Sequence, residues 1–286
     1  MAKVFVIDSQ GHREPFSWRK VYQSALRVGA QKALAKKIAT KISEEVYNNI
    51  PTSEIFKRVE HYLYEEEPKA GMRYSLKEAM RRLGPTGFLF EKYIASIFNK
   101  LGFTTQLNQY IQGACVTHEI DILSRKDNQI ILNECKFHAL AGGRVDLEVA
   151  MYAYARYLDI LNGDFLKQRG CRNCSLRSMI ITNAKFTTEA IKYAQCMNID
   201  LLGWRYPENR GLEYIIDSNK FYPITILPSL TADLLTLLAE NRIILIQDLL
   251  EADLPRLASK FKMNYSRLEQ LAKEAKLLLN GSAPNS

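Results

Sequence analysis

Two carboxylates and one lysine, Asp121, Glu134 and Lys136, are the side chains of this chain whose types and spacing could do chemistry together. Neighbouring carboxylates repel each other unless a cation lies between them, and carboxylate oxygens are the ligands that hard divalent cations prefer. An adjacent ammonium can orient an attacking water and neutralise charge on a reacting phosphate. The three residues therefore indicate metal-dependent hydrolysis of a phosphodiester, provided that the fold brings them together.

A β-hairpin is the element that must position these side chains. Residues 118–123 alternate apolar and polar side chains, and residues 131–137 are rich in Ile and Leu, so both segments are predicted to be strands. Asp127 and Asn128 can form a two-residue turn, because both residue types tolerate positive φ. With that turn the two carboxylates face each other, with Cβ atoms about 5 Å apart, and the lysine shares the face of the second acid. From spacing alone, an exposed hairpin face with solvated acids is an equal alternative, since a one-residue slip would undo the pairing.

The pattern of Asp121 followed, after a hairpin, by Glu134-Cys135-Lys136 resembles the PD-(D/E)xK nuclease motif. The surrounding sequence resembles the Mrr-type restriction endonuclease branch of that superfamily. A matching helix is expected over residues 87–101, where Glu91 lies at the edge of an apolar stripe. The resemblance implies that Asp121 and Glu134, with Glu91, hold Mg²⁺ or Mn²⁺. It also implies that Lys136 positions or deprotonates the attacking water and that DNA is the substrate.

Two further segments match that branch. A helix expected over residues 145–161 would pack on the sheet, and residues 179–202 are typical of a strand, a helix and a strand, with Thr187 or Thr188 as the helix cap. The glutamine that many relatives carry shortly after the lysine is absent, which leaves its substrate or water contact unassigned. In its place the region holds His138, Arg144 and Asp146.

Composition and charge set broader limits. The chain has 286 residues, of which 47% are hydrophobic, which suits two or three globular domains and excludes a disordered chain. A net charge of +8 favours a polyanionic partner, and a local basic run could follow a phosphate backbone or be a solvated loop. That run consists of Lys167, Arg169, Arg172 and Arg177.

The cysteines and the hydropathy indicate a cytoplasmic protein. The five cysteines are odd in number and no signal peptide precedes them, which favours a reduced setting over a disulfide scaffold. Cys171 and Cys174 have the spacing of half a zinc knuckle, but no second pair completes four ligands, so we interpret them as structural or incidental. No apolar run reaches transmembrane length, so no membrane partner is expected.

The N-terminal part of the chain resembles the ATP-cone, a small nucleotide-sensing domain. It combines a short apolar strand at residues 4–7 with three helical apolar stripes. The resemblance implies regulation by ATP or dATP. The residues that match the family's nucleotide contacts are Glu14, Lys20 and Thr52. Asp8 and Ser9 replace a basic pair that holds phosphates, which is the wrong charge for a triphosphate, so retained nucleotide binding and a solvated Lys20 are equal alternatives.

The C-terminal residues are predicted to form a small helical unit. Short helices are expected over residues 230–240, 245–251 and 265–279, after a strand at residues 224–227 between two prolines. The pattern resembles the helix-hairpin-helix repeat of DNA-handling proteins, but residues 241–243 lack the glycine that lets backbone amides approach a phosphate. We therefore favour a packing or assembly unit over a direct DNA contact.

These patterns predict an α/β protein with a restriction-endonuclease-like central mixed sheet flanked by helices, a small mainly helical ATP-cone domain before it and a small all-α domain after it. The expected domains are residues 1–84, 85–222 and 223–286. The predicted function is that of a divalent-metal-dependent DNA endonuclease, with DNA, a nucleotide and further copies of the chain in a homo-oligomer as partners. The alternatives are a nucleotide-regulated DNA-binding or transcription factor and an assembly adaptor, each with an inactive core. Sequence alone does not determine which form of nucleic acid is cut.

Overall fold

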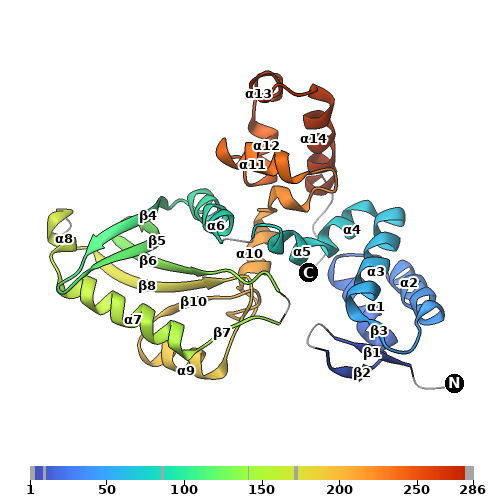
Figure 1. The fold of residues 1–286 in the computed structure, drawn as a ribbon, viewed down its shortest axis with the longest axis horizontal. Helices are drawn as coiled ribbons and strands as arrows, with labels where there is room; N and C mark the ends of the chain where they lie inside the picture. Colours follow the sequence, from blue (N-terminus) through green and yellow to red (C-terminus); the bar gives the residue numbers. More distant parts are fainter. Residues whose placement is uncertain (1–3, 9–10, 85–86, 141, 171–172, 281–286) are drawn as a thin grey trace. The chain divides into compact units, whose positions relative to one another are not determined.

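The computed structural model of the protein describes residues 4–8, 11–84, 87–140, 142–170 and 173–280, which form two compact units (Figure 1). The first, called here the terminal unit, takes in residues 1–79, 224–237 and 247–286. The second, called the sheet unit, takes in residues 80–223 and 238–246. All predicted metal-binding and catalytic residues belong to the sheet unit, and all predicted nucleotide contacts belong to the terminal unit. The division into three domains stays a prediction.

The sheet unit is built on a five-stranded mixed sheet with the strand order β10-β8-β6-β5-β4. Strands β4, β5 and β6 form an antiparallel meander, while β8 runs parallel to β6 and β10 runs parallel to β8. Their bounds are β4 (Thr104–Gln112), β5 (Thr117–Lys126), β6 (Gln129–Lys136), β8 (Ser175–Thr182) and β10 (Asp200–Leu202). The expected α/β fold with a central mixed sheet flanked by helices is confirmed at this level.

The β5–β6 hairpin has the predicted turn and register. Asp127 takes a φ of 51°, a conformation that Asp tolerates better than most residues, and Lys126 pairs with Gln129 across the turn. The same register continues to the pair Ile122 and Asn133. Local turn chemistry and the alternation of apolar side chains were therefore sufficient to predict how this hairpin pairs.

Helices cover the sheet, and α7 and α9 pack side by side against one face of it, while α6 lies on the other side (Figure 1). Small side chains allow α7 and α9 to approach closely, since Ala150 and Ala153 of α7 and Ala190 and Ala194 of α9 share one buried cluster. The helices of this unit are α6 (Phe88–Lys100), α7 (Leu147–Asn162), α8 (Phe165–Gln168), α9 (Thr188–Cys196) and α10 (Leu212–Asn219). A small two-stranded sheet joins β7 (Arg144–Val145) to β9 (Lys185–Phe186).

Side-chain caps fix where two of these helices begin. The carboxylate of Asp146 accepts a hydrogen bond from the backbone N–H of Val149 at the start of α7, and the hydroxyl of Thr187 accepts one from Ala190 at the start of α9. Each cap satisfies a backbone donor that the first turn of a helix leaves unpaired. Of the two cap residues expected for α9, Thr187 is the one used. Helix α7 packs against β5 and β6, the strands that carry Asp121, Glu134 and Lys136, while α9 packs against β8 and β10.

The terminal unit begins with a small three-stranded sheet and a helical bundle. Strand β1 (Phe5–Ile7) pairs with β2 (Arg13–Pro15) and with β3 (Ile50–Pro51). The helices are α1 (Trp18–Arg27), α2 (Lys32–Glu45), α3 (Thr52–Glu66), α4 (Pro68–Tyr74) and α5 (Leu76–Arg81), the last of which runs on into the sheet unit. The predicted apolar stripes are confirmed as core, since Ala25, Ile38, Ile42, Val59 and Leu63 are buried in one cluster.

The C-terminal segment contains one correction. Residues 224–227 were expected to form a strand, but Ile224–Ile226 form a 3-10 helix, in which the Leu227 N–H donates to the carbonyl oxygen of Ile224. A short apolar run predicts burial without deciding between strand and helix, and here no neighbouring strand accepts its backbone groups within the described residues. The helices that follow are α11 (Ala232–Glu240), α12 (Ile246–Glu251), α13 (Leu254–Phe261) and α14 (Tyr265–Leu279). Helix α13 was not predicted.

Cysteine chemistry differs in one place from the expectation. Cys115, Cys135 and Cys196 are free thiols, but Cys174 is disulfide-bonded, contrary to the reduced setting expected for all five. Cys171 lies outside the described residues, and so does the interpretation of the pair at 171 and 174 as half a zinc knuckle. Every helix in the described part of the chain is too short or too polar to cross a membrane.

Candidate active site

The sheet brings Asp121 against the segment that carries the other two predicted residues. The ladder between β5 and β6 ends at the pair Ile122 and Asn133, one position before Asp121 would face Glu134. Instead of pairing through its backbone, Asp121 accepts a hydrogen bond through Oδ2 from the backbone N–H of Cys135, at 2.7 Å. The Asp121 carboxylate is thereby tied to the residue between Glu134 and Lys136.

A break in strand geometry accompanies this placement. Ile120 and Leu123 lie in one apolar cluster with Ile160 of α7, although residues three apart on a regular strand point to opposite faces. The neighbouring strand is irregular at the same level, where Asn108 has a φ of 50° and is skipped between the pairs made by Leu107 and Gln109. The alternation therefore breaks at Asp121. Asn108 was not predicted as a special position, although Asn is the residue type that most readily takes a left-handed conformation after glycine.

Glu134 is a buried carboxylate held between two cations. Its side chain is 8% exposed, and its Oε1 atom lies 2.6 Å from Nζ of Lys136. Its Oε2 atom accepts a hydrogen bond from Nη1 of Arg156 on α7. Arg156 was not predicted as a site residue, and the available signal was that it is the only basic residue of that helix. A single cation on a helix that packs against a sheet is a candidate partner for a buried acid.

Glu91 shares the electrostatic environment of these acids. It lies in the first turn of α6, and its pKa is raised to about 7 by burial and by the negative charges of Asp121, Glu119 and Glu134. The positive charge of Lys136 acts in the opposite direction. The prediction that a helical glutamate faces the site is therefore supported by charge, although Glu91 makes no hydrogen bond to either of the other predicted acids among the interactions that the structure describes.

The pKa of Asp121 is raised to about 6 for related reasons. Burial is the largest cause and the charge of Glu134 the next, while the hydrogen bond from Cys135 and the charges of Lys136 and Arg156 lower it. Burial by itself would lower the pKa of Lys136, but its hydrogen bond with Glu134 and the nearby negative charges outweigh that effect and raise it. Lys136 is therefore a cation at neutral pH, next to acids that ionise less readily than usual.

The donor set suits a hard divalent cation in kind. Carboxylate oxygens are the ligands that Mg²⁺ and Mn²⁺ prefer, and a cation would relieve the repulsion that raises the pKa values of Asp121 and Glu91. In the described part of the chain, however, no three His, Cys, Asp or Glu side chains are grouped closely enough to hold a metal ion. Both oxygens of Glu134 are engaged by cationic side chains. The chemistry of the donors fits, but their present arrangement is not a closed ligand cage.

A second polar cluster fixes the turn between β4 and β5 to α7. Asp159 lies 2.7 Å from Nε2 of His118 through Oδ2, and it also accepts hydrogen bonds from the backbone N–H groups of Cys115 and Val116. Its pKa is lowered to about 2, first by the hydrogen bond with His118. Gly113 packs so closely against this carboxylate that a Cβ would not fit. Asp159 is one turn along α7 from Arg156, so this cluster anchors the helix that reaches Glu134.

His138, Arg144 and Asp146 lie in the region where many relatives of the nuclease branch carry a glutamine, and two of them have structural roles here. The backbone of His138 is clamped by Asn183, which accepts from its N–H at 2.8 Å and donates to its carbonyl oxygen at 2.9 Å. Asp146 caps α7, and Arg144 is an exposed residue of β7. None of these contacts reaches an acid of the site. The assignment of the glutamine's role therefore stays open to other residues.

The basic run is partly neutralised by neighbouring acids. Lys167 pairs with Asp164 at 2.8 Å, and Arg177 pairs with Asp200 at 2.6 Å. Arg169 lies 3.4 Å from the side-chain oxygen of Gln106. Arg172 lies outside the described residues. The run therefore offers less free charge to a phosphate backbone than its sequence indicates.

In the terminal unit, two of the three predicted nucleotide contacts meet each other. Nζ of Lys20 lies 2.7 Å from Oε2 of Glu14, and Thr52 is the first residue of α3. Asp8, which replaces a basic residue of the ATP-cone pattern, pairs with His12 at 3.2 Å. Ser9 lies outside the described residues. The structure therefore brings Glu14 and Lys20 together as an ion pair.

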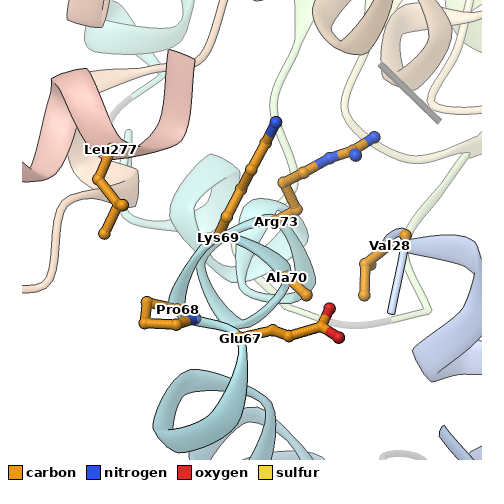
Figure 2. Close-up of a pocket in the computed structure, with 8 residues that line it drawn as sticks. Val28, Glu67, Pro68, Lys69, Ala70, Arg73 and Leu277 are labelled. Carbon is orange, nitrogen blue, oxygen red and sulfur yellow. The ribbon is translucent and has the colours of Figure 1, made fainter. Parts of the chain in front are cut away.

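A separate hollow of about 290 Å³ lies in the same unit (Figure 2). The turn after α1, helix α4 and Leu277 of α14 line it, so its walls are mostly apolar with Glu67, Lys69 and Arg73 among them. Glu14, Lys20 and Thr52 do not line this hollow. The predicted nucleotide contacts and this cavity are therefore separate features of the terminal unit.

Comparison with known proteins places the chain among relatives described without an activity. Residues 222–279 match the sequence model of a family described as "AF1548-like, C-terminal". An "Uncharacterized protein" of Archaeoglobus fulgidus is 41% identical over 134 residues, which are 47% of this chain and 71% of that protein. The solved "Crystal Structure of Protein of Unknown Function AF1548" is similar with a TM-score of 0.57 and 33% identity, and the match covers 68% of this chain and 99% of that one.

Proposed function

The chain belongs to the AF1548-like family, and from the site that it carries we propose that it is a divalent-metal-dependent endonuclease that hydrolyses DNA phosphodiester bonds. One observation carries the proposal. The carboxylate of Asp121 is bound to the backbone of Cys135, between Glu134 and Lys136, which themselves form an ion pair. Two acids and a lysine are thus gathered at one point of a mixed sheet, a set of groups that can support metal-assisted hydrolysis of a phosphodiester.

Each residue would have a separate task. Asp121 and Glu134 would hold Mg²⁺ or Mn²⁺, with Glu91 close enough to add its charge, and the cation would supply Lewis acidity and neutralise charge on the phosphate. Lys136 carries a positive charge at neutral pH and would orient the attacking water and stabilise the pentavalent phosphate. The raised pKa of Glu91 reflects burial and the charges of the neighbouring acids, which a divalent cation would offset.

The finer architecture belongs to the same proposal. We infer a restriction-endonuclease-like sheet, an ATP-cone-like domain that responds to ATP or dATP, and a helical C-terminal domain that supports assembly into a homo-oligomer. The pairing of Lys20 with Glu14 supports a polar contact site in the ATP-cone-like domain. A nucleotide would have to bind there without the basic pair that Asp8 and Ser9 replace.

A cleavage assay tests the nuclease proposal directly. Supercoiled plasmid, linear duplex, branched DNA, single-stranded DNA and RNA would be incubated with Mg²⁺ or Mn²⁺, with and without ATP or dATP. We expect metal-dependent cleavage that Asp121→Asn and Glu134→Gln abolish while DNA binding is retained. The matched control is Asp127→Asn, an acid of the same hairpin whose positive φ asparagine also tolerates. Equal cleavage by the parent and both site variants would contradict the proposal.

A nucleotide-regulated DNA-binding protein with an inactive core is the second candidate. The observation that favours it is that Lys136 and Arg156 already engage both oxygens of Glu134. This candidate predicts DNA binding that weakens steeply with salt, no cleavage with any metal, and no change in binding for Glu134→Gln. Binding of no nucleic acid would instead favour an assembly adaptor.

A further inference from the structure

We propose that Arg156 is a positioning residue of the site, whose ion pair with Glu134 must break before Glu134 can bind a divalent cation. The residue thereby sets the affinity of the site for metal. This inference rests on the proposed function, because it assigns Glu134 to the metal. It concerns a positioning residue that neither the sequence pattern nor the comparisons identify.

The contact is an enclosed ion pair. The Arg156 side chain is 13% exposed and the Glu134 side chain is 8% exposed, so little water competes for either group. The Arg156 guanidinium also lies over the ring of Tyr152, at 4.7 Å from its centroid. Removing one partner of a buried ion pair destabilises the protein, because the remaining charge is then buried without a counter-charge. Arg156, together with Lys136, therefore stabilises Glu134 as an ionised carboxylate.

The same pair leaves Arg156 incompletely satisfied. Its Nε atom is buried and has no hydrogen-bond partner among the described atoms. A guanidinium has five donor hydrogens and is at its strongest when two of them bind a carboxylate in parallel. The structure shows instead one nitrogen, Nη1, on one oxygen of Glu134. Part of the binding capacity of Arg156 is therefore unused in this arrangement, which makes its release from Glu134 less costly than that of a two-bond pair.

Arg156 and Lys136 differ in how they hold Glu134. Lys136 is 39% exposed and follows Glu134 on the same strand, so its flexible side chain can turn towards solvent or substrate. Arg156 reaches the carboxylate from α7, whose position is fixed one turn further on by the cluster of Asp159 and His118. The Arg156 side chain, and not its helix, must therefore move when Glu134 changes partner.

Metal binding without DNA tests this inference. Mn²⁺ affinity would be measured by calorimetry and by electron paramagnetic resonance for the parent, Arg156→Met and Arg156→Lys. We expect Arg156→Met to bind Mn²⁺ roughly fivefold or more tightly, because only the pair of Glu134 with Lys136, and no longer the pair with Arg156, competes with the metal. Arg156→Lys keeps a competing charge and should remain close to the parent. The matched control is Arg205→Met, which breaks another Arg–Glu pair of the sheet unit and should leave Mn²⁺ affinity unchanged.

Thermal stability in EDTA supplies a second measurement. Arg156→Met should lower the melting temperature, because Glu134 loses a counter-charge next to Asp121. The double variant Glu134→Gln with Arg156→Met should recover most of that loss, since a neutral amide needs no counter-cation. A purely structural role of Arg156 predicts that the double variant is as unstable as Arg156→Met, and that result would overturn the inference.

Failure of the inference and failure of the proposed function give different results. Weaker or unchanged Mn²⁺ binding by Arg156→Met, in a parent that binds Mn²⁺ and cleaves DNA, overturns the role of Arg156 alone. A parent that neither binds Mn²⁺ nor cleaves any nucleic acid overturns the proposed function, and the inference falls with it.

Discussion

The carboxylate of Asp121 accepts a hydrogen bond from the backbone N–H of Cys135 at 2.7 Å, just beyond the point where the β5–β6 ladder ends. The carboxylate takes the place of a backbone carbonyl in satisfying this N–H, so the end of the ladder leaves no unpaired donor at Cys135. It also holds Asp121 against the residue that lies between Glu134 and Lys136.

Lys136→Met should reduce DNA cleavage about a hundredfold or more, because an ammonium that stabilises developing phosphate charge contributes at least that much. Lys136→Arg should retain part of the activity, since it keeps the charge with a different geometry. Initial cleavage rates on plasmid measure the effect. Lys185→Met, at an exposed lysine of β9, is the control and should cleave as the parent does. A Lys136→Met protein with parental rates would remove this residue from the mechanism.

Stability in EDTA should depend on pH through Glu91. Its pKa is raised from 4.5 to about 7 in the folded protein, so folding favours the protonated acid. The folded state therefore loses stability as pH rises through this window, because the buried acid must then ionise. Glu91→Gln cannot ionise, so its melting temperature should match the parent at about pH 4 and exceed it increasingly up to about pH 7.5. Parallel curves for the two proteins over this range would show that Glu91 is not perturbed.

Added Mg²⁺ should flatten the same pH curve of the parent. The cation favours ionised carboxylates, so it offsets the loss of stability that ionisation of Asp121 and Glu91 causes. The measurement is the melting temperature with and without Mg²⁺ at each pH. Mg²⁺ should raise it most at pH values above about 7 and least near pH 4, where the acids are protonated. A Mg²⁺ effect that is the same at all pH values would not come from these acids.

Asn108 should be a position where only residues that accept positive φ are tolerated. Its φ of 50° costs most other residues about 1–2 kcal/mol, so Asn108→Val should lower the free energy of unfolding by that amount and Asn108→Gly should be close to neutral. Denaturant unfolding measures both. Thr104→Val, at an exposed position of the same strand, is the control and should not destabilise. If Asn108→Val were as stable as the parent, the break in the strand would not depend on this residue.

Asp159→Asn should loosen the turn between β4 and β5 and destabilise the protein at neutral pH. The pKa of Asp159 is lowered to about 2, so its contribution is present above the ordinary value near 3.8 and is lost as pH falls towards 2. The difference in melting temperature between the parent and the variant should therefore shrink between about pH 5 and pH 2.5. Asp164→Asn, an exposed acid two residues after α7, is the control and should change stability little. A constant difference across this pH range would exclude the charge of Asp159 as the cause.

Elements with strong local signals were predictable. The β5–β6 register followed from Asp127 and Asn128 and from the alternation around them, and the start of α9 followed from a cap at Thr187. The apolar stripes of α1, α2 and α3 likewise predicted which residues form their core. In each case residues close in sequence decide the structure, because turns, caps and helical faces are made within a few positions.

Other features depended on contacts that no local pattern contains. Residues 224–227 had the composition of a buried strand, but Ile224–Ile226 form a 3-10 helix that pairs with none of the strands in the described part of the chain. The residue type of Asn108 permits a left-handed conformation, but no local pattern indicated that this position of the strand would adopt one. The disulfide at Cys174 was also missed.

The sequence by itself determined the hairpin and its register up to the pair Ile122 and Asn133, because turn chemistry and side-chain alternation act over short distances. The expected pair of Asp121 and Glu134 lies beyond the end of that ladder, and the hydrogen bond of Asp121 with Cys135 replaces it. Only the tertiary structure decided that Arg156 binds Glu134 and that the charges of Asp121 and Glu134 raise the pKa of Glu91. The physical reason is that such contacts depend on how α6 and α7 pack on the sheet, and the strength of a charge interaction depends on the burial that this packing creates.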